Sequence, residues 1–341
     1  MKILIITQKV DINDGVLGFF HTWLEKMSRE MDLVVLANCV GEYHLPQNVQ
    51  IFSLGKEKGR NRLWKLVYYE FYLLKMLRRV DGIFFHMCPE YVLSAGFLPR
   101  LFRKKTLLWY THKRVDWKLK LAEKMVDKIF SASPKSFRLA SKKLEVTGHG
   151  IDIEKYKSAR HYPRRQDGEI KIITVGRVSS VKNIDILVMA GSLLNSKGTK
   201  FEIRIIGSPI LEEDKKYLVE LEELVDKNNL KSNVFFIGSI PNKDIEKHYR
   251  EADVFVNLSN TGSLDKAVLE AMASGLMILT SNEAFKDILP GRYLVSKNPE
   301  EIAGKIISLS GSPADDGLSD YVEKNHNLNI LVKKISNFFR G

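Results

Sequence analysis

The 341-residue sequence predicts an α/β protein with two doubly wound, Rossmann-like domains, each built on a parallel sheet. Short apolar runs alternate with amphipathic stretches along the whole chain, which is typical of parallel strands covered by helices on both faces. The chain is also longer than a domain with a single hydrophobic core usually is. A polar segment poor in apolar residues, 154–169, separates two series of such strands. These observations favour two domains over one.

The expected strands are short apolar runs that end in polar residues or glycine. The first series comprises residues 2–7, 32–37, 82–86, 106–110, 128–133 and 144–148. The second series comprises residues 170–176, 201–207, 233–238, 253–259 and 276–281. Helical periodicity fills the gaps between them, for example at residues 183–194 and 211–227.

The domain boundaries follow from these two series. We expect an N-terminal domain at residues 1–153, a linker at 154–168 and a C-terminal domain at 169–320. Residues 321–341 predict a final amphipathic helix, because apolar residues recur there at helical spacing: Ile330, Leu331, Ile335 and Phe338.

The composition argues against several classes of protein. Only two cysteines occur, Cys39 and Cys88, which excludes a disulfide framework or a cysteine-based zinc site and fits a reducing cytoplasm. The first apolar run is short and predicts a strand rather than a signal peptide. No uncharged apolar run approaches the ~18–20 residues that a membrane span needs. We therefore expect a cytoplasmic chain that does not cross a bilayer.

The positive charge is concentrated in the first half of the chain. Residues 1–150 hold 26 Lys and Arg against 14 Asp and Glu, whereas the rest holds 27 of each, so the whole net charge of +12 lies in the first half. Residues 59–79 and 99–124 combine these cations with aromatic residues. Such segments suit an anionic membrane surface or a nucleic acid. The alternatives are a solvated basic face and, for residues 59–79, a core helix whose aromatics face inward.

The segment IKIITVGRVSSVKN places two cations after a strand. The strand ends at Gly176, Arg177 and Lys182 follow, and a helix opens at Asn183. Ligands of parallel sheets bind above the carboxyl ends of the strands, and cations beside a helix N-terminus suit a diphosphate. Two solvated loop cations are the alternative. The P-loop pattern is absent from the sequence.

Glu270 lies within a segment, residues 266–274, that predicts a helix with apolar residues on every side. Such a helix is usually buried, and a buried carboxylate needs hydrogen-bond donors. A structural lysine or backbone N–H groups could supply them, and so could the two neighbouring hydroxyls of a ribose. The preceding loop, NTGSLD, offers small residues and backbone N–H groups for an oxygen-rich ligand at Gly262, Ser263 and Asp265.

Several motifs in order carry a family resemblance. Four segments resemble the nucleotide-binding half of retaining glycosyltransferases of family 4, within glycosyltransferases group 1. They are, in order, TVGRVSSVKN, IIGSP, VFFIGSIPNKDIEKHYREADVFVNLS and LEAMASGLMILTSN. VTGHGIDIEKY resembles the family's N-G-I-D segment. The resemblance runs over most of residues 140–310. It implies the GT-B fold, with the two domains facing a central cleft and the C-terminal helix crossing back to the N-terminal domain.

The resemblance also implies roles for single residues in the C-terminal domain. Arg177 and Lys182 match the pair that neutralises the donor diphosphate. Glu270 matches the second glutamate of the Glu-x7-Glu element and would accept from the ribose hydroxyls. Gly207 and the pair Ile237–Gly238 match segments that border the ribose and base.

In the N-terminal domain, Gly18 falls in a turn that the family places near the phosphates, and His112 falls near the family's active-site histidine, which lies by the transferred sugar. The sequence also departs from the pattern. Gly262 stands where the family has its first glutamate, with Asp265 as the nearest acid, and His149 replaces the asparagine of N-G-I-D.

The resemblance implies an enzyme that moves a hexose-type sugar, with retention, from a UDP- or GDP-linked donor to a hydroxyl acceptor. The acceptor would be a lipid-linked or cell-surface glycan. The basic half then suits peripheral contact with the inner face of an anionic membrane, and we expect no nucleic-acid partner. We expect no cofactor and no obligatory metal, because no metal-ligand spacing occurs and cations stand at the diphosphate. The rivals are a catalytically weakened nucleotide- or glycan-binding module and a basic nucleic-acid-binding protein.

Overall fold

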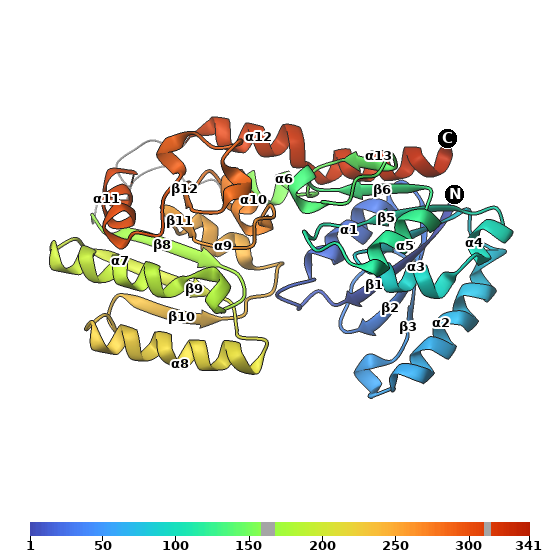
Figure 1. The fold of residues 1–341 in the computed structure, drawn as a ribbon, viewed down its shortest axis with the longest axis horizontal. Coiled ribbons are helices and arrows are strands. Elements are labelled where there is room, and N and C mark those ends of the chain that lie inside the picture. The colour runs from blue at the N-terminus through green and yellow to red at the C-terminus, as the bar shows by residue number, and fades with distance from the viewer. Residues whose placement is uncertain (158–167, 310–314) are drawn as a thin grey trace. The chain divides into compact units, whose positions relative to one another are not determined.

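The computed structural model describes residues 1–157, 168–309 and 315–341 (Figure 1). The chain divides into two compact units. The first comprises residues 1–152, 241–243 and 325–341, and the second comprises residues 153–240 and 244–324. Most of the linker expected at 154–168 lies outside the described residues, and its start forms the short helix α6 (Ile153–Lys157).

The first unit contains a sheet of seven parallel strands within the described residues, in the order β3-β2-β1-β4-β5-β6-β7. Its strands are β1 (Lys2–Val10), β2 (Asp32–Val40), β3 (Val49–Ser53), β4 (Gly82–His86), β5 (Lys105–Trp109), β6 (Lys128–Ser131) and β7 (Leu144–Val146). Strand β3 is absent from the strands that the sequence predicts. It is an edge strand that pairs only with β2, so most of its side chains stay partly exposed and its apolar pattern is weak.

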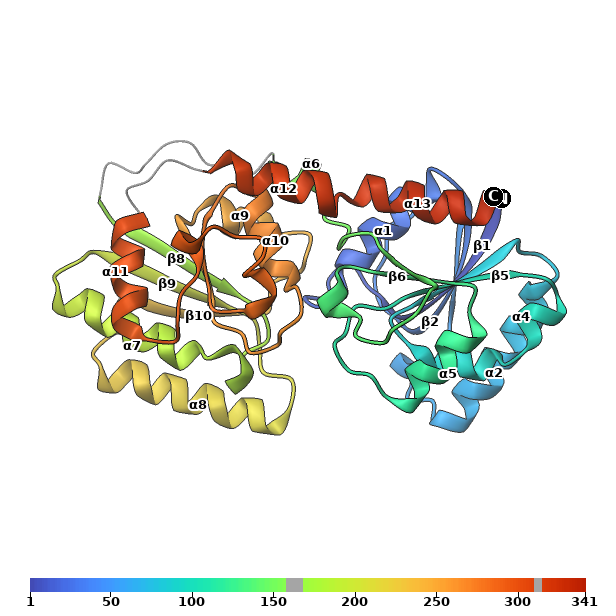
Figure 2. The ribbon, with the colours of Figure 1, turned by 45° about the horizontal axis from the view of Figure 1, so that its top comes forward.

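Helices cover both faces of this sheet (Figure 2). Helices α1 (Phe19–Ser28) and α13 (Leu328–Arg340) pack on one face, and α2 (Arg62–Leu77), α3 (Pro89–Ala95) and α5 (Trp117–Met125) pack on the other. Successive side chains of β1 point to opposite faces of the sheet. Ile3 and Ile5 therefore pack on the face that α1 covers, whereas Leu4 and Ile6 pack on the face that α2 covers. The expected return of the C-terminal helix to the N-terminal domain is confirmed by α13.

The second unit contains five parallel strands within the described residues, in the order β10-β9-β8-β11-β12. They are β8 (Ile170–Val175), β9 (Phe201–Ile206), β10 (Val234–Gly238), β11 (Val254–Asn257) and β12 (Met277–Thr280). The order reverses between β8 and β11, which makes the carboxyl ends of these two strands the expected ligand-binding point of a doubly wound sheet.

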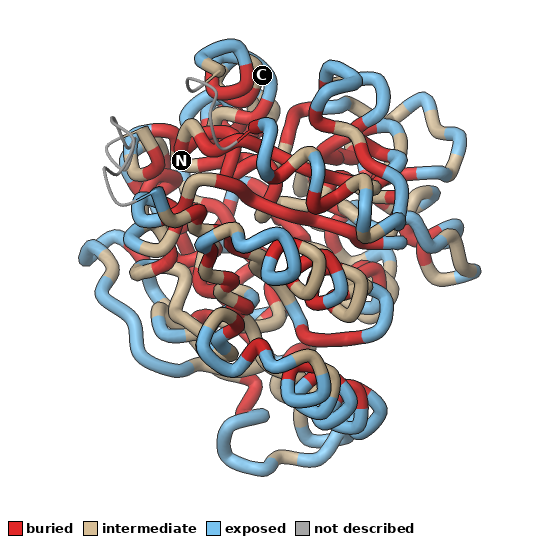
Figure 3. The backbone as a smooth tube through the Cα atoms, turned by 90° about the vertical axis from the view of Figure 1, so that its left-hand side faces the viewer, coloured by how far each residue is buried: buried red, intermediate tan, exposed pale blue. Residues whose placement is uncertain are grey.

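The described helices of the second unit, besides α6, are α7 (Ile184–Ser196), α8 (Glu212–Lys227), α9 (Ile245–Arg250), α10 (Lys266–Ala273), α11 (Pro299–Leu309) and α12 (Asp316–His326), whose last two residues belong to the first unit. Buried residues follow the strands and the inner faces of the helices (Figure 3). The sixteen-residue helices α2 and α8 are the longest in the described parts, and no described helix combines the length and hydrophobicity that a membrane crossing requires.

The single helix expected at residues 321–341 is in fact two helices, α12 and α13, which break at Asn327. The reason is a strand-like bridge. The Ile151 N–H donates to the His326 carbonyl at 2.6 Å, and the Leu328 N–H donates to the Ile151 carbonyl at 2.8 Å. Asn327 takes an extended conformation and its side chain caps α13 by accepting from the Asn329 N–H.

The break brings a buried histidine into contact with the backbone. His326 accepts the His149 N–H at 3.1 Å through Nδ1, and burial, assisted by the neighbouring His149, lowers the pKa of His326 to about 3. In the unfolded chain the imidazole of His326 has its ordinary pKa of 6.5, so it binds a proton more tightly there than in the folded chain. Protonation of His326 therefore favours unfolding. His326 therefore supports folding above pH 6.5, and this support is lost as the pH falls toward 3.

We predict that replacing His326 by asparagine makes the stability of the protein less sensitive to acid. The amide oxygen can still accept from His149, but the titrating ring is gone. Melting temperatures of the wild type and His326→Asn, measured from pH 7 down to pH 4, should show a shallower fall for the variant. The exposed Gln47, which does not titrate, provides the control Gln47→Asn, which should keep the wild-type slope. An unchanged slope in His326→Asn would contradict the assignment.

Candidate functional site

Glycines end three neighbouring strands of the second sheet. Gly176 follows β8, Gly207 follows β9 and Gly238 ends β10, and all three have positive φ. The Gly207 N–H donates to the Gly238 carbonyl at 2.8 Å, and a Cβ on Gly207 would lie 1.9 Å from the Gly176 oxygen. Close packing of backbones therefore requires glycine at 207. The same edge presents backbone instead of side chains, so a ligand can approach it closely.

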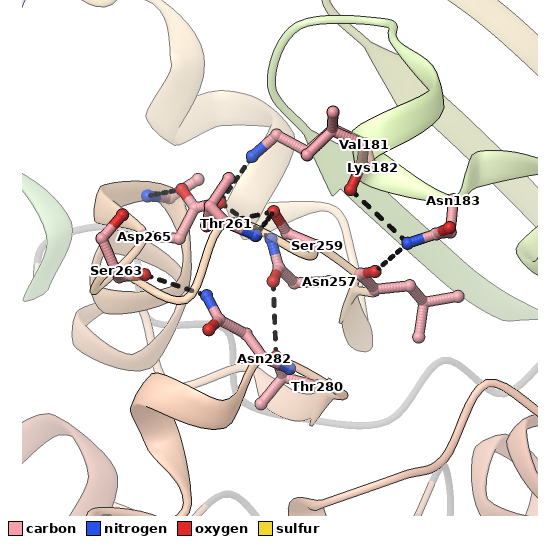
Figure 4. A network of polar contacts seen from close by, with 12 residues as sticks. Val181, Lys182, Asn183, Asn257, Ser259, Thr261, Ser263, Asp265, Thr280 and Asn282 are labelled. Atoms are coloured by element: carbon pink, nitrogen blue, oxygen red, sulfur yellow. Dashed lines mark hydrogen bonds and ion pairs between the residues drawn. The ribbon is translucent and has the colours of Figure 1, made fainter. Parts of the chain in front are cut away.

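Lys182 lies over this edge. It ends the 3-10 helix η3 (Ser180–Lys182), and a Cβ added to Gly176 would meet its Cε at 3.3 Å. Its Nζ forms an ion pair with Asp265 Oδ2 at 2.5 Å (Figure 4). The two side chains are only 18% and 15% exposed. The structure thus joins the loop after β8 to the loop after β11, across the point where the strand order reverses.

Asp265 is held by more than its lysine. Its side chain accepts from Asn257 Nδ2 at 3.0 Å and caps helix α10 by accepting from the Ala267 N–H. Burial alone would raise the pKa of Asp265, but the Lys182 ammonium and these donors lower it below its ordinary value. Asp265 is therefore a charged carboxylate with internal partners, and its predicted contact with a ligand stays a prediction.

A network of amides and hydroxyls fixes the loop between β11 and α10 (Figure 4). Asn257 accepts from the Thr280 hydroxyl at 3.3 Å, and Asn282 Nδ2 donates to the Ser263 carbonyl at 3.0 Å. Asn183 Nδ2 donates to the Leu258 carbonyl at 2.6 Å. The sequence pattern assigned these side chains no role. The available signal was the polar residue at the end of each apolar strand, as in VFVN and MILT.

Arg177 also follows β8, but it faces a different acid. Its Nε lies 3.6 Å from Asp214 Oδ2, and Asp214 is buried in the first turn of α8, where it also accepts from the Leu211 N–H. Arg177 remains partly exposed. The two cations predicted to hold a diphosphate therefore have separate carboxylate partners in this structure.

Glu270 is buried on α10 with two internal partners. Its Oε1 lies 3.3 Å from Lys266 Nζ, and its Oε2 accepts from the Tyr249 hydroxyl at 3.2 Å. Burial, followed by the Glu270 charge, raises the pKa of Tyr249 well above its ordinary value, so that the hydroxyl stays a donor. The lysine partner that the sequence left open is thus present, and the ribose role of Glu270 stays a prediction.

Three further residues of the second unit were predicted to contact the donor: Ile237, Gly262 and Ser263. Ile237 is partly exposed on β10, and Gly262 takes a positive φ of 61° in the loop before α10. Ser263 contributes its carbonyl oxygen to Asn282. The described side chains include no group of three His, Cys, Asp or Glu arranged to hold a metal ion.

Gly18 and His112 belong to the first unit. The Gly18 N–H donates to the Asp14 carbonyl at 3.0 Å, and a Cβ there would lie 2.3 Å from that oxygen, so the turn itself requires glycine. Asp14 Oδ1 accepts from the Val16 and Leu17 N–H groups, which are amides of the turn predicted to approach the phosphates. Lys9 Nζ binds the other oxygen of Asp14 at 2.6 Å.

His112 is exposed after β5, and its Nδ1 accepts from the Arg114 N–H at 3.1 Å. Partial burial of the ring, with Lys113 and Arg114 nearby, lowers the pKa of His112. The imidazole is therefore predominantly neutral at pH 7. A neutral imidazole can exchange a hydrogen bond with a sugar hydroxyl.

Residues 157–327, half of the chain, match the family described as glycosyl transferases group 1. The chain belongs to this family. It is 27% identical over 190 residues to the amylovoran biosynthesis glycosyltransferase AmsK of Erwinia amylovora, covering 51% of this chain and 44% of that protein. It is 26% identical over 135 residues to the α-monoglucosyldiacylglycerol synthase of Streptococcus pneumoniae, covering 40% and 29%. The chain thus matches less than half the length of these relatives.

Solved structures of similar fold span the whole chain. The Anabaena Alr3699/HepE structure in complex with UDP-glucose has a TM-score of 0.77 at 15% identity, covering 100% of this chain and 99% of that one. Sucrose-phosphate synthase from Thermosynechococcus elongatus has a TM-score of 0.76 at 15% identity, covering 100% and 98%. The two parallel-sheet units and these similarities confirm the GT-B fold.

We predict that Asp265 supports the second unit in two separable ways. Asp265→Asn keeps a capping side chain but leaves the Lys182 charge unpaired, which should cost roughly 1–3 kcal/mol for a pair that water partly reaches. Asp265→Ala also removes the cap and should cost about 1 kcal/mol more. Urea unfolding of the full chain measures both. The exposed pair Lys231–Asp226 supplies the control Asp226→Asn, expected within about 0.5 kcal/mol of wild type. Equal stability of the three variants would contradict the prediction.

Proposed function

We propose that this chain transfers a sugar from a nucleotide-diphosphate donor to a hydroxyl acceptor. The observation that carries the proposal is the position of Lys182. Its ammonium lies beside the glycine-ended carboxyl edge of the second sheet, where the strand order reverses, and this unit carries most of the family match. A cation at that point suits the diphosphate of a bound donor.

The proposed mechanism is electrostatic. As the bond between sugar and diphosphate breaks, negative charge gathers on the leaving phosphate, and preorganised cations stabilise it. Lys182 would exchange part of its contact with Asp265 for a phosphate oxygen, and Arg177 would do the same against Asp214. We propose that these cations act where other enzymes use a divalent ion. We assign no protein nucleophile, and we propose retention with the leaving phosphate as the proton acceptor, as family 4 membership would imply.

The donor and acceptor are proposed by class. UDP-linked and GDP-linked hexoses both fit a diphosphate site, and the similarity to a protein solved with UDP-glucose supports the UDP form. The names of two relatives refer to amylovoran biosynthesis and to a glucosyldiacylglycerol, which supports a glycan or lipid-linked acceptor. A weakened binding module is the second candidate, favoured by Gly262 at the position of the family's first glutamate.

We predict that Lys182→Ala and Arg177→Ala each lower turnover by about 100-fold or more, because each removes charge stabilisation from the leaving group. The measurement is nucleotide release from UDP- and GDP-sugars, with and without EDTA, and we expect EDTA to change nothing. Exposed cations of the same unit give the controls Lys200→Ala and Arg250→Ala, which should retain activity. Near-wild-type rates in the folded site variants would contradict the assignment. Donor binding without any release in the wild type would favour the binding module.

We predict that Glu270→Ala weakens nucleotide binding by about tenfold, the usual order for a lost hydrogen bond to a charged group. Calorimetric titration with UDP and GDP measures the affinity. Tyr249→Phe is the matched control, because it removes an internal donor to Glu270 but keeps the carboxylate. It should lower stability and leave nucleotide affinity close to wild type. A folded Glu270→Ala protein with unchanged affinity would refute the ribose role.

A further inference from the structure

Helix α2 of the first unit has two apolar faces. One face, with Tyr69, Leu73 and Leu77 at spacings of four residues, is buried against the sheet. The opposite side is also apolar and is exposed: Leu63, Trp64, Val67, Phe71 and Leu74. Trp64 and Phe71 are each 57% exposed. Contiguous apolar side chains exposed on a protein surface commonly mark an interaction site, so this exposed side calls for a partner.

The exposed side of α2 is accompanied by further apolar residues around the short helix α4 (Leu98–Leu101). Phe97 and Leu101 are 71% and 76% exposed. Helix α4 lies beside the C-terminal end of α2 in Figures 1 and 2, and the Arg78 guanidinium lies 6.0 Å from the Phe102 ring centroid. We refer to these seven residues as the outer apolar face: Leu63, Trp64, Val67, Phe71, Leu74, Phe97 and Leu101.

Cations surround the outer apolar face. Between residues 59 and 79 the chain has six cations and a single acid, Glu70. The six are Arg60, Arg62, Lys65, Lys75, Arg78 and Arg79. Within the residues that the structure describes, none of the six forms an ion pair with an acid. Two of them lie near aromatic rings, since Arg60 is 3.9 Å from the Tyr68 ring centroid and Lys75 Nζ is 5.8 Å from that of Phe71. Their charges therefore remain available to an outside partner.

We infer that the outer apolar face is a docking surface for an anionic lipid bilayer. Aliphatic and aromatic side chains at its centre would enter the interface between headgroups and acyl chains, and the cations around it would contact anionic headgroups. The net charge of +12 complements such a surface. The same charge disfavours a second copy of this chain, because two cationic faces would repel. Nucleic acid fits less well, because leucine and valine side chains offer it no stacking surface.

The surface lies entirely within the first unit, so the inference does not depend on sugar transfer. Its test is co-sedimentation of the full chain, without nucleotide, with vesicles of phosphatidylcholine alone or mixed with phosphatidylglycerol. We expect binding to the mixed vesicles at low salt, weaker binding at about 0.5 M NaCl because salt screens the headgroup charge, and little binding to phosphatidylcholine alone.

The double variant Trp64→Gln/Phe71→Gln should lower partitioning onto the mixed vesicles by about tenfold or more, because two large apolar side chains no longer enter the bilayer. Both side chains point away from the core, so the fold should survive. The matched control Met189→Gln/Val219→Gln changes exposed apolar residues of the second unit and should bind like wild type. Three results would overturn the inference: no vesicle binding at low salt, equal binding of the double variant, or a dimer that dissociates in the double variant while vesicles are ignored.

Discussion

The second unit depends on a partly buried ion pair between Lys182 and Asp265. A lysine drawn out of water is costly unless a carboxylate faces it. Asp265 supplies that carboxylate and begins helix α10 with the same side chain. The pair joins the loop after β8 to the loop after β11, at the two strand ends that border the reversal of strand order. Asn257 extends this constraint to β12 through Thr280.

The carboxylates of the candidate site already have partners within the chain. Asp265 faces Lys182, Asp214 faces Arg177, and Glu270 faces Tyr249 and Lys266. Under the proposed function, a diphosphate would meet cations that already face internal acids, and it would compete with those acids for them. Such an arrangement orients the cations before the ligand arrives, which is the condition for electrostatic stabilisation at low reorganisation cost. The internal contacts would lower the affinity for a ligand, because each cation must partly give up its contact with an acid when the ligand binds.

In the first unit, the cations around helix α2 lie beside an exposed apolar surface. The sheet buries one apolar cluster against each of its two helical layers, yet helix α2 keeps an apolar side that neither cluster covers. The aromatics of α2 are divided: Tyr69 packs inward, whereas Trp64 and Phe71 point outward. The alternative of a core helix with all its aromatics inward is thus correct for one side of α2 only. Cations surround the other side and form no ion pair with an acid in the described parts of the chain, so this surface carries a net positive charge.

The sequence determined the described strands other than β3, the alternation of strands and helices, and the position of Lys182 after β8, because these depend on local apolar periodicity and on the order of motifs. It could not show β3, whose edge position leaves few buried side chains, or the break at Asn327, which a backbone bridge to the distant Ile151 imposes. Only the tertiary structure decided the partners of Asp265 and Glu270. A carboxylate chooses among donors by distance, and Lys182, Asn257 and Tyr249 come close only when the chain is folded.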